Sequence, residues 1–137
     1  MRIISAAMKA VRQYGLEGVR IQNISKLAGV SPGALYRYFD SKEQLMMECF
    51  TYVDKQAAGI FDCMKFDPRN MLTDPMEAVR SLWVPYFRFW LARPDETVFY
   101  HRFRDSAFFR HTIRAGMPVI LIDSLEWYRY FGRHFLI

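Results

Sequence analysis

The sequence has few of the features that mark secreted, membrane-spanning or disulfide-bonded proteins. Only two cysteines occur in 137 residues, too few for a disulfide framework, which favours a reducing, cytoplasmic location. No stretch approaches 18 uncharged apolar residues, so we expect no transmembrane helix and no membrane partner. Lys9 and Arg12 interrupt the apolar residues near the N-terminus. This segment is therefore predicted to be a helix rather than a signal peptide.

Motifs for catalysis and metal binding are also missing. The chain contains no glycine-rich phosphate loop, no H-E-x-x-H and no C-x-x-C. Its histidines, His101, His111 and His134, lack the spacing of local metal ligands. Cys49 and Cys63 fall on one predicted helix, about 21 Å apart along its axis, and cannot bridge each other. We expect no enzymatic activity, no cofactor and no metal, with a thiol redox sensor as a minor alternative.

Charge is unevenly distributed along a chain whose composition is otherwise globular. Hydrophobic residues make up 52% and charged residues 24%, with a net charge of +5. The first 45 residues carry seven basic and three acidic side chains, a net +4, whereas the remainder carries only +1. This asymmetry indicates a polyanion-binding head on a body with another role. A solvated basic surface without a partner is the alternative.

Apolar periodicity and capping residues predict an all-α fold. Gly29 has the place of a left-handed residue that ends a helix, and Ser31 that of an N-cap followed by proline. Residues 107–116 are ambiguous. Pro118 starts a final helix in one interpretation, and 119–122 form a short strand in the other. The predicted helices are 2–14, 21–28, 32–39, 42–64, 75–92 and 95–106.

The second and third predicted helices, joined by a tight glycine turn, form a helix-turn-helix. At 100° per residue, Leu35 and Phe39 share the buried side of the third helix, and Arg37 lies opposite. Tyr36 and Tyr38 flank that arginine. Arginine can reach guanine O6 and N7, and phenolic hydroxyls can reach the flanking phosphates. The alternatives are tyrosines packed in the core and an arginine that is only solvated.

The run Ala28–Leu45 reads A-G-V-S-P-G-A-L-Y-R-Y-F-D-S-K-E-Q-L. It is similar to the A-G-V-S-x-G-x-L-Y-x-Y-F-x-x-K-x-x-L hallmark of the TetR family of bacterial transcriptional regulators. The resemblance covers residues 2 to about 46. It implies a three-helix DNA-binding head, residues 1–45, which a long fourth helix joins to a helical effector-binding and dimerisation body, residues 46–137. We expect this body to be incomplete at its C-terminus.

The resemblance also implies which residues of the head contact DNA. Residues 32–34 and Arg37 would face bases, whereas the two tyrosines and Lys42 would face phosphates. Arg20 stands where the family usually has a Thr or Ser cap, so that cap is in doubt and a phosphate contact is its alternative role. The implied DNA-binding set is Arg20, Ser31, Pro32, Gly33, Ala34, Tyr36, Arg37, Tyr38 and Lys42.

Aromatic residues concentrate in the body and are candidates for lining an effector pocket. Pro85 should kink the fifth helix, and kinks open cavities. The alternative is that these rings form plain core, which helical spacing cannot distinguish from a pocket. The candidate pocket residues are Phe61, Met64, Trp83, Tyr86, Phe87, Trp90, Phe99, His101 and Phe103.

The sequence as a whole predicts a cytoplasmic, sequence-specific transcriptional regulator. We expect a homodimer on a pseudo-palindromic double-stranded operator. A small, largely apolar or aromatic effector would release this repressor from DNA. One alternative is a ligand-independent architectural DNA-binding protein. Another is an enzyme or metabolite carrier with an accessory basic end.

Overall fold

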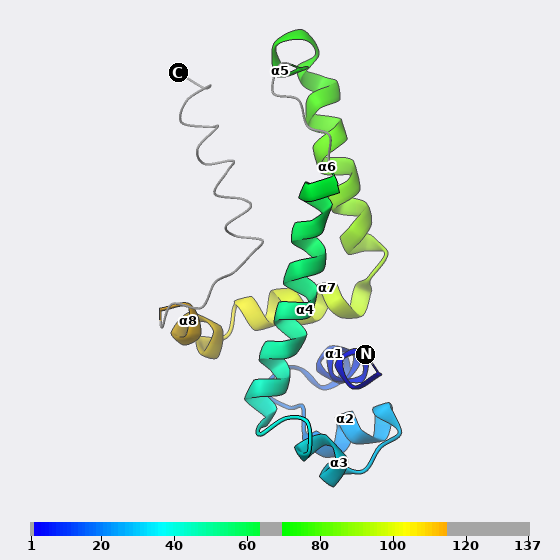
Figure 1. The fold of residues 1–137 in the computed structure, drawn as a ribbon, viewed down its shortest axis with the longest axis vertical. Coiled ribbons are helices and arrows are strands. Elements are labelled where there is room, and N and C mark those ends of the chain that lie inside the picture. Colours follow the sequence, from blue (N-terminus) through cyan, green and yellow to red (C-terminus); the bar gives the residue numbers. More distant parts are fainter. Residues whose placement is uncertain (1, 64–69, 115–137) are drawn as a thin grey trace. The chain divides into compact units, whose positions relative to one another are not determined.

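The computed structural model describes residues 2–63 and 70–114, and its regular elements in these ranges are all α-helices (Figure 1). The predicted all-α class is therefore confirmed for the described residues. The expected choice between helix and strand after Pro118 lies outside them. The helices are α1 (Arg2–Tyr14), α2 (Ile21–Ala28), α3 (Pro32–Tyr36), α4 (Lys42–Cys63), α5 (Asn70–Thr73), α6 (Pro75–Leu91), α7 (Pro94–Arg104) and α8 (Ala107–Arg114).

The chain divides into two compact units, and the division falls within α4. The first unit comprises Met1–Val53 and Arg93–Met117, so it contains α1 to α3, the start of α4, α7 and α8. In this unit α1 packs against both α2 and α7. The described part of the second unit contains the rest of α4, α5 and α6.

Aromatic rings join α4, α7 and α8 in the core of the first unit. The Phe50 ring stacks on Tyr100 with centroids 5.0 Å apart. It also contacts Phe103 at 5.3 Å and Phe109 at 4.9 Å. All four side chains are buried. The sequence-based division placed α7 and α8 in the body. This packing instead groups them with the head, because their rings contact Phe50 of α4.

The second unit contains a long helix that continues through a proline. Asp74 begins α6 as its N-cap, where its Oδ1 accepts a hydrogen bond of 3.0 Å from the Glu77 amide. Pro75 follows at the first helical position, as the sequence predicts. Pro85 lies inside the helix, which runs on to Leu91. The short helix α5, which packs against α6, has no counterpart in the sequence prediction.

Candidate nucleic-acid interface

The turn between α2 and α3 is closed by a left-handed glycine. Gly29 has φ +66°, a conformation that costs glycine little. Its amide donates to the Lys26 carbonyl at 3.3 Å, and the Val30 amide donates to the Ser25 carbonyl at 3.0 Å. These bonds satisfy two carbonyls of the last turn of α2. The predicted C-terminal glycine is confirmed, and the chain is turned sharply into α3.

The candidate recognition helix α3 is shorter than the sequence predicts. Ser31 caps it by accepting a 3.2 Å hydrogen bond from the Ala34 amide, as expected. The helix ends at Tyr36 rather than residue 39 because the amides of Tyr38 and Phe39 both donate to the Leu35 carbonyl, each at 3.0 Å. This shared acceptor tightens the end of the helix into a turn.

Leu35 anchors α3 in the head, and the opposite face is exposed. The Leu35 side chain is 1% exposed, whereas Tyr36 and Tyr38 are 55% and 71% exposed. The alternative that these tyrosines pack in the core is therefore wrong. Arg37 is also exposed and keeps right-handed helical dihedrals, φ −76° and ψ −20°, so the phase argument still places it opposite Leu35. Phe39, expected to be buried, is only half-buried.

The start of α3 presents small side chains to solvent. Ser31, Pro32 and Gly33 are exposed, and Ala34 is half-buried. Apart from its chain neighbours and the backbone of its own helix, a Cβ placed on Gly33 would meet no atom within 4 Å. Glycine is thus not required at this position by the packing of the head. Its smallness suits close approach by an external surface.

Arg20 begins α2 without capping it through its side chain. No cap hydrogen bond comes from that side chain, which is exposed. Instead, the Arg20 amide donates to Asn23 Oδ1 at 3.1 Å, which supplies one half of a capping box. Asn23 thus compensates in part for the missing Thr or Ser, and the Arg20 guanidinium faces solvent.

Lys42 lies in the first turn of α4 and has an intramolecular contact. Its Nζ is 3.5 Å from the Val19 carbonyl oxygen, and the side chain is half-buried. The turn itself is capped as predicted, because the Gln44 amide donates to Ser41 Oγ at 3.0 Å. The Gln44 side chain in turn accepts from the Asp40 amide. Lys42 therefore places its charge beside the N-terminus of α4 while contacting the segment that precedes α2.

Known proteins are similar to this chain in the region of the head. A family model described as "Bacterial regulatory proteins, tetR family" matches residues 3–49. The HTH-type transcriptional repressor NicS of Pseudomonas putida is 30% identical over 93 residues, which are 68% of this chain and 42% of NicS. The HTH-type transcriptional regulator RutR of Escherichia coli K12 is 49% identical over 43 residues, 31% of this chain and 20% of RutR. The head of this chain, residues 3–49, therefore belongs to the TetR family.

A solved structure extends the likeness beyond the head of the chain. The crystal structure of a TetR family transcription regulator from Marinobacter aquaeolei VT8 matches with a TM-score of 0.77 and 27% identity. The match covers 96% of this chain and 67% of the other. The chain spans less than half the length of NicS and RutR.

Four of the expected pocket residues gather on α6 in the second unit. The ring centroids of Trp83 and Phe87 are 5.7 Å apart, and Tyr86 lies edge-on to Trp83 at the same distance. Tyr86 also contacts Trp90 at 6.0 Å. Trp83 and Phe87 are 44% and 56% exposed, while Trp90 is buried. Met64 lies outside the described residues.

The remaining expected pocket residues with described side chains belong to the first unit. Phe99 and Phe103 are buried and stack at 5.6 Å within its aromatic core. His101 is exposed, with its ring edge-on to that of Tyr100. Phe61 lies on α4, but its side chain is outside the described part. Two grooves formed by described residues of the first unit contain none of the expected pocket residues.

The sequence analysis did not predict the polar contacts between α1 and α7. Arg102 Nη1 donates at 2.7 Å to the Val11 carbonyl near the end of α1, which also accepts a 2.9 Å hydrogen bond from the Gly15 amide. Arg12 Nη1 forms an ion pair of 2.8 Å with Asp95 Oδ1. Both links span more than 80 positions in sequence. Nothing in local spacing signals such pairs.

Other candidate chemistries find little support in the described residues. Cys49 is buried, and burial raises the pKa of its thiol far above the usual range, which disfavours the reactive thiolate. Among residues 2–63 and 70–114, no three His, Cys, Asp or Glu side chains gather as a metal site would require. None of the helices in these ranges is long and apolar enough to span a bilayer.

Proposed function

We propose that this TetR-family protein is a sequence-specific DNA-binding transcriptional regulator that acts as a repressor. The observation that carries the proposal is the exposed face of α3, which Leu35 anchors and Ser31 caps. That face combines small residues with the Arg37 guanidinium and two exposed phenol rings. Arginine can read guanine in the major groove, and tyrosine hydroxyls can bond to phosphates.

The basic head adds attraction to DNA that is independent of sequence. Arg20, at the N-cap of α2, and Lys42, at the start of α4, would contact phosphates. Each phosphate that is neutralised releases condensed counterions, so binding should weaken as salt rises. One head provides few contacts, and a homodimer would place two heads on the half-sites of a pseudo-palindrome.

For regulation, we propose a small, largely apolar or aromatic effector bound by the body. Its support is the cluster of rings on α6, in which the large side chains of Trp83 and Phe87 remain partly exposed. Such an effector would favour a state that does not fit the operator. Phe99 and Phe103, which are fully buried, would shape the first unit rather than contact the effector.

The experiment is selection of binding sites from a random pool of duplexes at fixed salt. We expect an enriched pseudo-palindrome, bound by two protomers. Uniform recovery of all sequences would contradict specific recognition and favour an architectural DNA-binding protein. Repeating the selected complex with a library of apolar metabolites tests the effector. A compound that releases DNA and raises the melting temperature supports it, and no release by any compound would favour the ligand-independent alternative.

A further inference from the structure

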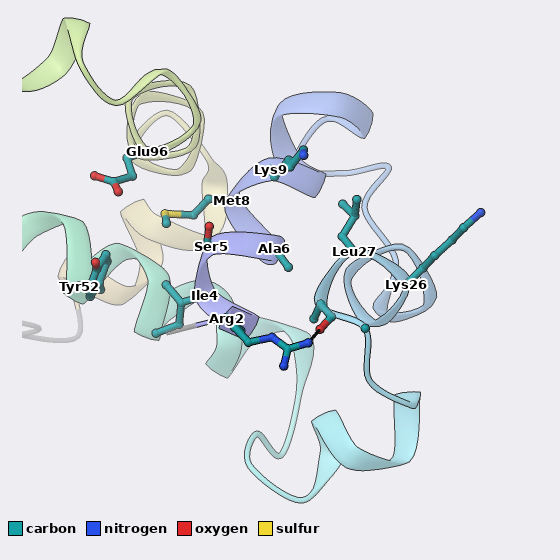
Figure 2. Close-up of a pocket in the computed structure, with 12 residues that line it drawn as sticks. Arg2, Ile4, Ser5, Ala6, Met8, Lys9, Lys26, Leu27, Tyr52 and Glu96 are labelled. Carbon is teal, nitrogen blue, oxygen red and sulfur yellow. Dashed lines mark hydrogen bonds between the residues drawn. The ribbon is translucent and has the colours of Figure 1, made fainter.

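A groove in the first unit runs alongside the helix-turn-helix, on the surface of α1 and α2. It has a volume of about 630 Å³, and residues of α4 and α7 complete its lining (Figure 2). Arg2, on the first turn of α1, extends its guanidinium toward the end of α2. Lys9 lines the same groove from the same helix. Both side chains are basic, and that of Arg2 forms a hydrogen bond with the end of α2.

Arg2 binds the backbone where α2 ends. Its Nη2 donates to the Ala28 carbonyl at 2.8 Å, across 26 positions of sequence. The Ala28 carbonyl belongs to the last turn of α2, whose acceptors lack partners within the helix. Amides of the turn satisfy two acceptors slightly earlier in α2, those of Ser25 and Lys26. Arg2 thus supplies a side-chain donor to the end of α2 in addition to the amides of the turn. Its positive charge also compensates the negative end of the helix dipole.

The guanidinium also packs closely over the turn residue. A Cβ on Gly29 would lie 3.2 Å from Arg2 Nη2, tighter than an ordinary contact. Gly29 therefore serves two purposes, since it adopts φ +66° and leaves room for the arginine. The first turn of α1 is in this way joined directly to the turn that precedes α3.

The orientation of α3 depends strongly on this turn. The helix has only five residues, Pro32–Tyr36, and Leu35 is its one buried side chain. So short a helix has little packing of its own to fix its angle. The residues that precede it, Gly29 to Ser31, must set the direction in which its exposed face points.

We propose that Arg2 is a positioning residue for α3, and that it acts through the carbonyl of Ala28 rather than by contacting DNA. The inference rests on the proposed DNA-binding function and goes beyond the residues of the exposed face. Arg2 would lower the entropic cost of ordering the recognition helix on the operator, since a turn held in advance loses less freedom on binding.

The test compares Arg2→Met with Lys9→Met, which removes the same charge from the same groove. Arg2→Met should weaken binding to the selected operator by roughly three- to tenfold, the loss expected for one hydrogen bond. The slope of log affinity against log salt should stay unchanged, because no phosphate contact is lost. Lys9→Met should change neither quantity. Arg2→Lys, which keeps one donor, should recover part of the affinity.

Amide hydrogen exchange of the free protein supplies a second readout. Exchange at Gly29 and Val30 should be faster in Arg2→Met and unchanged in Lys9→Met. A salt slope lower by about one unit with unchanged exchange would overturn the proposal in favour of a phosphate contact. Unchanged affinity and exchange would show that Arg2 has no role. Exchange requires no DNA, so failure of wild-type protein to select any duplex would refute the proposed function while exchange still tests Arg2.

Discussion

At Gly33, a substitution that the fold should tolerate is expected to weaken DNA binding. A Cβ there meets nothing within 4 Å, and alanine has the better helix propensity. Gly33→Ala should therefore be at least as stable as the wild type in urea unfolding. It should nevertheless weaken operator binding, because the added methyl group occupies the surface that approaches the bases. Loss of stability without loss of affinity would refute the assignment of Gly33 to the interface.

Lys42 is expected to neutralise one phosphate. Lys42→Ala should lower the salt slope by roughly one unit per protomer and weaken binding about equally for all duplexes. Lys55→Ala is the control, since it removes an exposed charge from the same helix. If both variants kept the wild-type slope in a salt titration, Lys42 would not contact a phosphate. Its role would then be limited to the contact with the Val19 carbonyl.

We expect Glu96 to make the unfolding free energy depend on pH. Burial raises the pKa of its carboxyl, the neighbouring Arg93 opposes the rise, and Asp95 adds to it. Because the folded state binds this proton more tightly than the unfolded state, the protonated Glu96 carboxyl contributes stability below the usual pKa. This contribution is lost as pH rises through the raised pKa.

The variant Glu96→Gln removes that titration. As pH rises above about 4, the wild type should lose more unfolding free energy than the variant. Urea unfolding across this range measures the difference. If the variant lost as much as the wild type, or more, another group would carry the pH dependence.

At the scale of elements, the guanidinium groups of Arg102 and Arg12 join α7 to α1. Arg102→Met removes the charged donor to the Val11 carbonyl, which still accepts from the Gly15 amide, and should cost about 1–2 kcal/mol of unfolding free energy. Asp95→Asn breaks only an ion pair whose side chains are 48% and 38% exposed, and should cost less than about 1 kcal/mol. Chemical unfolding of the two variants compares them. An equal or larger loss for Asp95→Asn would reverse this order.

Helix ends show which parts of the fold local sequence can predict. The caps at Ser31, Ser41 and Asp74 are as predicted, since each acceptor lies three residues before its donor. The end of α3 was predicted three residues too late. Apolar spacing continues to Phe39, but the bifurcated bonds to Leu35 that end the helix leave no signature in that spacing.

At the scale of the molecule, long-range packing is what the sequence could not supply. Phe103 and Trp83 have the same helical spacing to their aromatic neighbours, yet one is buried and the other is 44% exposed. The contact between Arg2 and Ala28 spans 26 positions. The faces of α3 could be predicted because the phase of a helix depends only on local geometry.

The central claim, that the exposed face of α3 reads DNA sequence, is tested most directly by the base preferences of Arg37→Ala. Arg37 is the one long hydrogen-bond donor on that face. Site selection with the variant should lose preference at one symmetric base-pair position and keep it elsewhere, at a cost of about 1–3 kcal/mol per contact. If the variant selected the same site with unchanged preferences at every position, α3 would not read bases through Arg37, and the account would be contradicted.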